Sequence, residues 1–131
     1  MKNIFKFLLA LAFLASFSLT SNAQIEDVIE INNTNISVPN VYDFGDITEA
    51  VYTRYYIKNN RGSAVTVSNI TTPAGFFANI SDMNIASGKR VILYVGLEPS
   101  YVPEKGKFEK EIIIQTNLVT DIIIKLKGNI P

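Results

Sequence analysis

The sequence of 131 residues contains no cysteine, no histidine and no tryptophan. These absences exclude thiol nucleophiles, Ser-His-Asp triads and zinc sites built on Cys or His ligands. Catalysis would have to use carboxylates, tyrosines or lysines alone, so we expect no enzyme activity, no catalytic residues, no cofactor and no metal centre. Because no disulfide can form, a folded domain must depend on its hydrophobic core.

The first 23 residues have the features of a secretory signal peptide. Lys2 and Lys6 precede a short apolar run, and Ser21-Asn22-Ala23 has the small-x-small pattern of a cleavage site. The apolar run is shorter than the roughly 20 residues that a membrane-spanning helix requires. We therefore predict cleavage at the end of this motif, a mature chain that begins at Gln24, and export to the periplasm or the extracellular space.

Removal of the signal segment also changes the charge balance. The whole chain has 12 basic and 12 acidic residues, and the loss of Lys2 and Lys6 leaves a slight acidic excess. Nucleic-acid binding requires clustered positive charge, so we expect no nucleic-acid partner. Because no cysteine follows the apolar run, we expect no lipid anchor and no membrane insertion after cleavage.

The mature chain has the residue pattern of an all-β protein. Apolar residues recur with period two in short runs that Gly, Pro and Asn clusters separate, and no segment has a convincing helical period. We predict a single antiparallel immunoglobulin-like β-sandwich of about seven strands over residues 38–131, with a small barrel as the alternative. Residues 24–37 are either a flexible lead-in or an edge strand. The expected strands are near 29–38 and at 51–58, 64–70, 76–80, 90–97, 108–116 and 122–127.

The alternation within each strand predicts which side chains face inward. The expected core residues are Tyr55, Ile57, Leu93, Val95, Ile112, Ile114, Ile124 and Leu126. Between the last two strands, residues 117–121 are expected to form a five-residue loop that pairs Ile114 with Ile124 on the inner face. This register directs Ile113 and Ile123 outward, diagonal to each other.

Five short motifs follow one another in the order of a known family. They are Tyr42-Asp43-Phe44-Gly45-Asp46-Ile47, Tyr55-Tyr56-Ile57-Lys58-Asn59, Ile85-Ala86-Ser87-Gly88, Gly106-Lys107-Phe108-Glu109-Lys110 leading into Ile112 to Asn117, and Ile124-Lys125-Leu126-Lys127-Gly128. With these motifs, residues 38–130 resemble bacterial domain-of-unknown-function family 1573, an exported domain similar to the Hydin-type and sperm-protein-like immunoglobulin-type β-sandwiches. The resemblance implies this fold and export, and it supplies no activity and no catalytic residues.

The chain departs from the family pattern at two places. Many members carry Cys-Gly-Cys after the third strand, where this chain has Thr71-Thr72-Pro73-Ala74-Gly75, so a redox or metal role of those thiols is excluded here. Members also place Gly two residues after the hairpin Asn, whereas this chain has Arg61 and then Gly62. The resemblance therefore implies a longer turn or a bulge at this point.

Four residues form the candidate partner surface. Tyr52 and Tyr56 lie on the outward register of their strand, where they would either stack on a sugar or protein partner or stabilise the sheet. Ile113 and Ile123 are two isoleucines on a face that is otherwise polar, although scattered exposed apolar residues are common. The expected partner is an unknown protein or a second copy of the chain.

Two pairs of carboxylates support an alternative function. Asp43 and Asp46 flank a glycine and offer oxygen ligands for Ca²⁺, although calcium requires six to eight of them. Glu109 and Glu111 share a strand face at the roughly 7 Å spacing that some glycosidases use, or they are ordinary solvent-facing charges. We expect a non-catalytic exported interaction or structural module of the bacterial envelope, with a calcium- or carbohydrate-binding module as the alternative.

Overall fold

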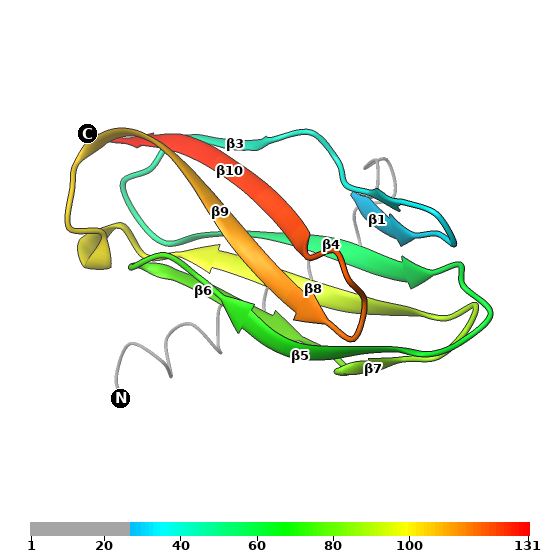
Figure 1. The fold of residues 1–131 in the computed structure, drawn as a ribbon. Helices are drawn as coiled ribbons and strands as arrows, with labels where there is room; N and C mark the ends of the chain where they lie inside the picture. The colour runs from blue at the N-terminus through cyan, green and yellow to red at the C-terminus, as the bar shows by residue number, and fades with distance from the viewer. Residues whose placement is uncertain (1–26) are drawn as a thin grey trace, which may run out of the picture.

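The computed structural model describes residues 27–131, and this part of the chain is built from β-strands (Figure 1). The predicted signal peptide and Gln24 lie outside the described residues. The strands are β1 (Val28–Ile31), β2 (Ile36–Ser37), β3 (Tyr42–Asp46), β4 (Val51–Asn59), β5 (Val65–Thr71), β6 (Phe76–Ile80), β7 (Asn84–Ile85), β8 (Arg90–Leu97), β9 (Gly106–Thr116) and β10 (Ile122–Ile130), with one 3-10 turn, η1 (Pro99–Tyr101). Between residues 27 and 131, no helix is long and apolar enough to cross a bilayer.

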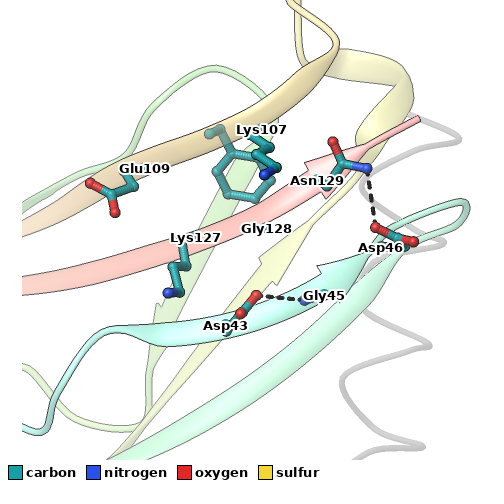
Figure 2. Close-up of a pocket in the computed structure, with 9 residues that line it drawn as sticks. Asp43, Gly45, Asp46, Lys107, Glu109, Lys127, Gly128 and Asn129 are labelled. Atoms are coloured by element: carbon teal, nitrogen blue, oxygen red, sulfur yellow. Dashed lines mark hydrogen bonds between the residues drawn. The ribbon is translucent and has the colours of Figure 1, made fainter.

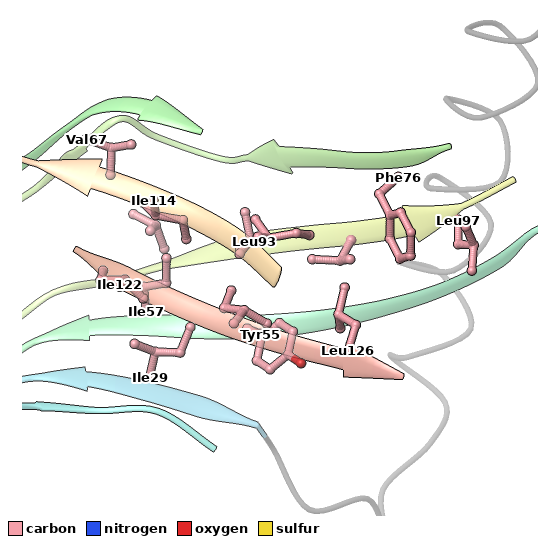
Figure 3. Close-up of a cluster of buried hydrophobic side chains, with 14 of the residues drawn as sticks. Ile29, Tyr55, Ile57, Val67, Phe76, Leu93, Leu97, Ile114, Ile122 and Leu126 are labelled. Carbon is pink, nitrogen blue, oxygen red and sulfur yellow. The ribbon is translucent and has the colours of Figure 1, made fainter. Parts of the chain in front are cut away.

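The strands form a sandwich of two five-stranded sheets. The first sheet has the order β2-β1-β4-β8-β6, and the second has the order β3-β10-β9-β5-β7. Apolar side chains from the inner faces of both sheets fill the space between them (Figure 3). All eight predicted core residues are at most 1% exposed, so the predicted inward register of these strands is confirmed.

The prediction of about seven strands in a purely antiparallel arrangement is wrong. Both sheets are mixed, because β1 runs parallel to β4 and β3 runs parallel to β10. The chain enters the first sheet with β1 and β2 and then crosses to the second sheet through residues 38–41, as the cyan segment of Figure 1 shows. This crossing places early strands beside strands that come much later in the chain.

The additional strands are short and have weak sequence signals. The strand expected near 29–38 is interrupted at 32–35 and forms β1 and β2 instead. Two aspartates and a glycine occur within β3, and these residues are rare in strands. Within residues 24–37, predicted as a flexible lead-in or an edge strand, β1 and β2 belong to the first sheet, and Ile29 and Ile31 of β1 are fully buried there.

The hairpin of β9 and β10 has the predicted loop but a different register. Residues 117–121 connect the strands, whereas Ile114 pairs with Ile122 and not with Ile124. The difference arises because the end of β9 follows β5: the Asn117 N–H donates to the Thr66 carbonyl, and the Thr66 N–H donates to Asn117 Oδ1. A shift of two residues keeps every side chain on its predicted face.

Candidate functional site

Ile113 and Ile123 lie on the outer face of the second sheet, as predicted. They pair directly opposite each other, not diagonally. The Ile123 side chain is 40% exposed and Ile113 is half-buried. Ile113 lines a hollow of about 660 Å³ together with residues that include Val41 and Lys125. Apolar side chains from separate segments therefore gather at this part of the face, which we call the isoleucine patch (Ile113, Ile123 and Val41).

Charged residues of β9 and β10 occupy the next outward positions of this face. Glu111 lies opposite Lys125, and Glu109 lies opposite Lys127, so each of the two glutamates faces a lysine across the β9–β10 pair. Opposite charges at directly facing positions stabilise a sheet. The glutamates are thus placed as solvent-facing charges of a cross-strand ladder, and the isoleucine patch lies next to this ladder.

Asp43 and Asp46 line a second hollow on the same face, of about 550 Å³ (Figure 2). Asp43 Oδ1 accepts a hydrogen bond of 2.8 Å from the Gly45 N–H, and Asp46 Oδ1 accepts one of 3.1 Å from the Asn129 amide. Lys107 and Lys127 line the same hollow and bring positive charge to the carboxylates. Within the described range 27–131, no group of three or more Asp, Glu, His or Cys side chains is placed to hold a metal ion.

Tyr52 and Tyr56 lie on the opposite side of the molecule, on the outer face of the first sheet. Their neighbours along β4 alternate with them and point into the core. The guanidinium carbons of Arg90 and Arg54 lie 4.2 and 5.2 Å from the centroid of the Tyr56 ring, which are cation-π distances. Burial and the negative charge of Glu98 raise the pKa of Tyr52. The two tyrosines therefore cannot form one continuous surface with the isoleucines.

A groove along one side of the sandwich includes Ile123 and was not predicted from the sequence. This side groove has a volume of about 610 Å³ and lies between two loops, 32–35 and 117–121. Its apolar lining consists of Ile36, Val38, Leu118, Val119 and Ile123. Val119 is fully exposed at the loop tip. The lining comes from segments far apart in the sequence, so only the fold brings it together.

The turn after β4 holds the wall of the side groove in place. The Asn60 amide donates to Asn32 Oδ1 at 2.9 Å, and the Arg61 guanidinium donates to the carbonyls of Asn32 and Asn33 at 3.3 and 3.1 Å. Asn59 anchors this turn from inside the protein, where it is completely buried. The groove is therefore a fixed feature of the fold, because its loops are bonded to the body of the sandwich.

Comparison with known proteins shows that the fold of this chain is similar to parts of solved structures. No protein-family model matches the chain, and no curated protein matches it. The crystal structure of a protein of unknown function from Porphyromonas gingivalis is similar over 83% of this chain, with a TM-score of 0.62 and 18% sequence identity. This chain spans about half of that protein, because the match covers 49% of it.

Two proteases of Vibrio cholerae are also similar in part. The VesB protease matches 68% of this chain with a TM-score of 0.53 and 13% identity, and the secreted serine protease VesC matches 67% with a TM-score of 0.51 and 14% identity. The matched regions cover 30% of the VesB chain and 21% of the VesC chain. At these identities the likeness shows a shared fold, and this chain has no histidine from which a Ser-His-Asp triad could be built.

Proposed function

We propose that this chain is a non-catalytic, exported immunoglobulin-like module of the bacterial envelope that binds another protein. The observation that carries the proposal is the isoleucine patch, which interrupts a polar and charged outer face and continues through Ile123 into the apolar part of the side groove. The solvent-facing side of a sheet does not need a continuous apolar surface for its own stability. Apolar area that reaches across two hollows is a feature of interaction surfaces.

The immunoglobulin-like assignment is supported by the architecture and by the motifs. Two facing sheets within about one hundred residues, with a crossing between the sheets, are typical of such domains. The motifs of the family 1573 resemblance coincide with structural positions, since Tyr42–Asp46 is the whole of β3 and 124–128 lies within β10. The predicted signal peptide supports export.

The placement of the ionisable groups supports a non-catalytic role. The carboxylates at 43 and 46 accept hydrogen bonds from their own surroundings, and those at 109 and 111 face lysines. Tyr55 is the most deeply buried tyrosine, and burial, then the charges of Asp27 and Tyr42, raise the pKa of its hydroxyl far above the usual value. This hydroxyl therefore stays protonated at physiological pH and is a poor nucleophile.

The proposal is tested by capturing proteins from an envelope extract on the tagged chain 24–131. We expect the Ile113→Ser/Ile123→Ser double variant to lose proteins that the parent chain retains. The matched control is Lys107→Ser/Asn129→Ser, which changes another directly opposed pair on the same two strands, outside the hollow beside the isoleucine patch and outside the side groove. An unchanged captured set from the isoleucine variant contradicts the proposal, and so does a loss that the control shares.

The same variants separate binding from structural roles. If the isoleucines are covered within the molecule, the double variant loses stability at every concentration, whereas a self-association surface gives a dimer that disappears in sedimentation. The alternative of a calcium-binding module is tested by calorimetric titration with Ca²⁺. Clear binding heat that Asp43→Asn/Asp46→Asn abolishes would favour the alternative over a protein-binding role.

A further inference from the structure

The side groove has an unpaired strand edge along one wall. All nine residues of β10 pair with β9 on one side. On the other side, β3 pairs with β10 only from Leu126 onward. The first four residues of β10, Ile122 to Lys125, therefore have a neighbouring strand on one side alone, and Ile123 lines the side groove at this place.

The direction of the backbone groups follows from the register. The Asn129 carbonyl accepts a hydrogen bond of 2.8 Å from the Ile47 N–H, so the peptide groups of Asn129 face the β3 side. Successive residues of a strand direct these groups to alternate sides, and the β9–β10 register is continuous. The N–H and C=O of Ile123 and the N–H of Lys125 consequently face the same side as Asn129. Among the described residues, no backbone hydrogen bond joins them to another segment on that side.

The unpaired edge exists because the chain changes sheets. Residues 38–41 leave β2 and cross to β3, so no strand occupies the position beside Ile122 to Lys125. Ile36 and Val38 line the groove across this open position from β10. Four strand residues span about 13 Å, which is enough for a short extended segment.

We propose that the side groove binds an extended segment of a partner polypeptide, which adds as a short strand to β10 at Ile123 and Lys125. This inference rests on the proposed function and names the kind of partner that the surface fits. An extended main chain offers donors and acceptors at the spacing of the unpaired groups, and its alternate side chains reach the apolar lining. No aromatic side chain lines the groove, so it offers no ring on which a sugar would stack.

Among the edges of the sandwich, the open part of β10 borders the side groove, whereas β6 (Phe76–Ile80), at one edge of the first sheet, contributes no residue to it. β2 and β7 have two residues each. The β3 edge is interrupted where Gly45 adopts a φ of 71° and its N–H is bonded to Asp43, and such irregularities hinder pairing with a further strand. By contrast, β10 is held along its full length by β9 and is already in the conformation that an added strand requires.

The experiment measures amide hydrogen exchange by NMR on the ¹⁵N-labelled chain 24–131. In the free chain, the amides of Ile123 and Lys125 should exchange at least tenfold faster than those of Ile122 and Ile124, which face β9. The probe is an acetylated and amidated hexapeptide of alternating valine and threonine at millimolar concentration, since a few main-chain bonds support only weak affinity. Its addition should slow exchange at Ile123 and Lys125, and a proline-interrupted version of the peptide should not.

Variants separate groove binding from other causes. Val38→Asp places a charge in the lining and should abolish the protection. The matched control is Ile80→Asp, at another partly buried position that packs against the core but lies outside the groove, and it should preserve the protection. Protection of both amides in the free chain at every dilution overturns the inference, because the edge is then already covered. Protection that grows with protein concentration shows a second copy as the occupant and overturns it as well.

Absence of any peptide effect on the parent chain also overturns the inference, whether or not Val38→Asp folds. This result leaves the proposed function standing if the isoleucine double variant still loses its captured proteins. Conversely, peptide protection without any capture that depends on Ile113 and Ile123 contradicts the proposed function.

Discussion

The side-chain amide of Asn59 donates a hydrogen bond of 2.9 Å to the backbone carbonyl of Ile85 and so joins the end of β4 to β7. The same amide donates to the Ser63 carbonyl at 2.9 Å, and Asn59 Oδ1 accepts from the Arg61 N–H at 2.9 Å. Asn59 is 0% exposed, so these bonds satisfy a polar group that the core would otherwise leave without partners. Asn59 organises the turn after β4. The two residues that follow it, Asn60 and Arg61, hold the wall of the side groove.

Replacement of Asn59 should therefore be strongly destabilising. Asn59→Ala leaves two carbonyls and one N–H without their partner, and we expect the free energy of unfolding to fall by about 2–4 kcal/mol. The control is Asn60→Ala at the neighbouring exposed position, where the loss should be below about 1 kcal/mol. Urea denaturation measures both values, and similar losses for the two variants would show that the buried bonds contribute little.

Removal of the Tyr55 hydroxyl should have the opposite effect. This oxygen is buried and has no hydrogen-bond partner, so folding strips it of water without compensation. We expect Tyr55→Phe to raise the free energy of unfolding by about 1 kcal/mol. Tyr94→Phe, on the outer face of the first sheet, should leave it unchanged. A stability loss in the Tyr55 variant would show that the hydroxyl is paired in solution.

The same residue predicts how stability changes in alkaline solution. Burial, and then the charges of Asp27 and Tyr42, raise the pKa of Tyr55 above its ordinary value of 10.0. Above pH 10 the unfolded chain therefore releases the Tyr55 proton while the folded protein retains it, so unfolding becomes easier as pH rises. In this range Tyr55 lowers the free energy of unfolding by about 1.4 kcal/mol for each pH unit of increase. Denaturation between pH 9 and pH 11 should show a shallower decline for Tyr55→Phe than for the parent chain.

Two positions on opposite faces of β9 test the register of the sandwich. Ile114 is 0% exposed in the core, whereas Glu111 is exposed on the outer face. Ile114→Ala should cost about 2–5 kcal/mol through lost burial and the cavity that remains, and Glu111→Ala should cost almost nothing. Equal melting temperatures for the two variants would contradict the assigned faces of the strand.

Processing is tested on the protein recovered from an envelope fraction. The charged, apolar and small-x-small segments at the start of the sequence predict removal of residues 1–23, so the intact mass should correspond to a chain that begins at Gln24. Retention of Met1 on protein from this fraction would show that the segment is not cleaved.

The inner faces of the strands could be predicted because they depend on local geometry. Side chains alternate along any strand, so apolar alternation alone placed Tyr55, Leu93 and Ile112 in the core. Which strands become neighbours depends on distant segments, and the sequence pattern does not contain this information. The bonds between Asn117 and Thr66 altered the last hairpin in the same way, because they join residues 51 positions apart.

The candidate site could be predicted only in part for the same reason. Alternation correctly directed Ile113 and Ile123 outward, and Tyr52 and Tyr56 as well. Placing the two pairs on opposite faces requires knowledge of which sheet contains each strand. The side groove requires more, since its lining comes from 32–38, Arg61 and 117–123, which meet only in the folded chain.

The position of β10 has a consequence for the rate of folding. This last strand lies between β3 and β9, and its Asn129 bonds to Asp46, 83 residues earlier. The second sheet therefore cannot close until β10, including the buried Ile130, has been synthesised. Pairings of such long sequence separation fold slowly, in milliseconds to seconds. The growing chain thus remains open until β10 has been made, and the sandwich forms only after that point.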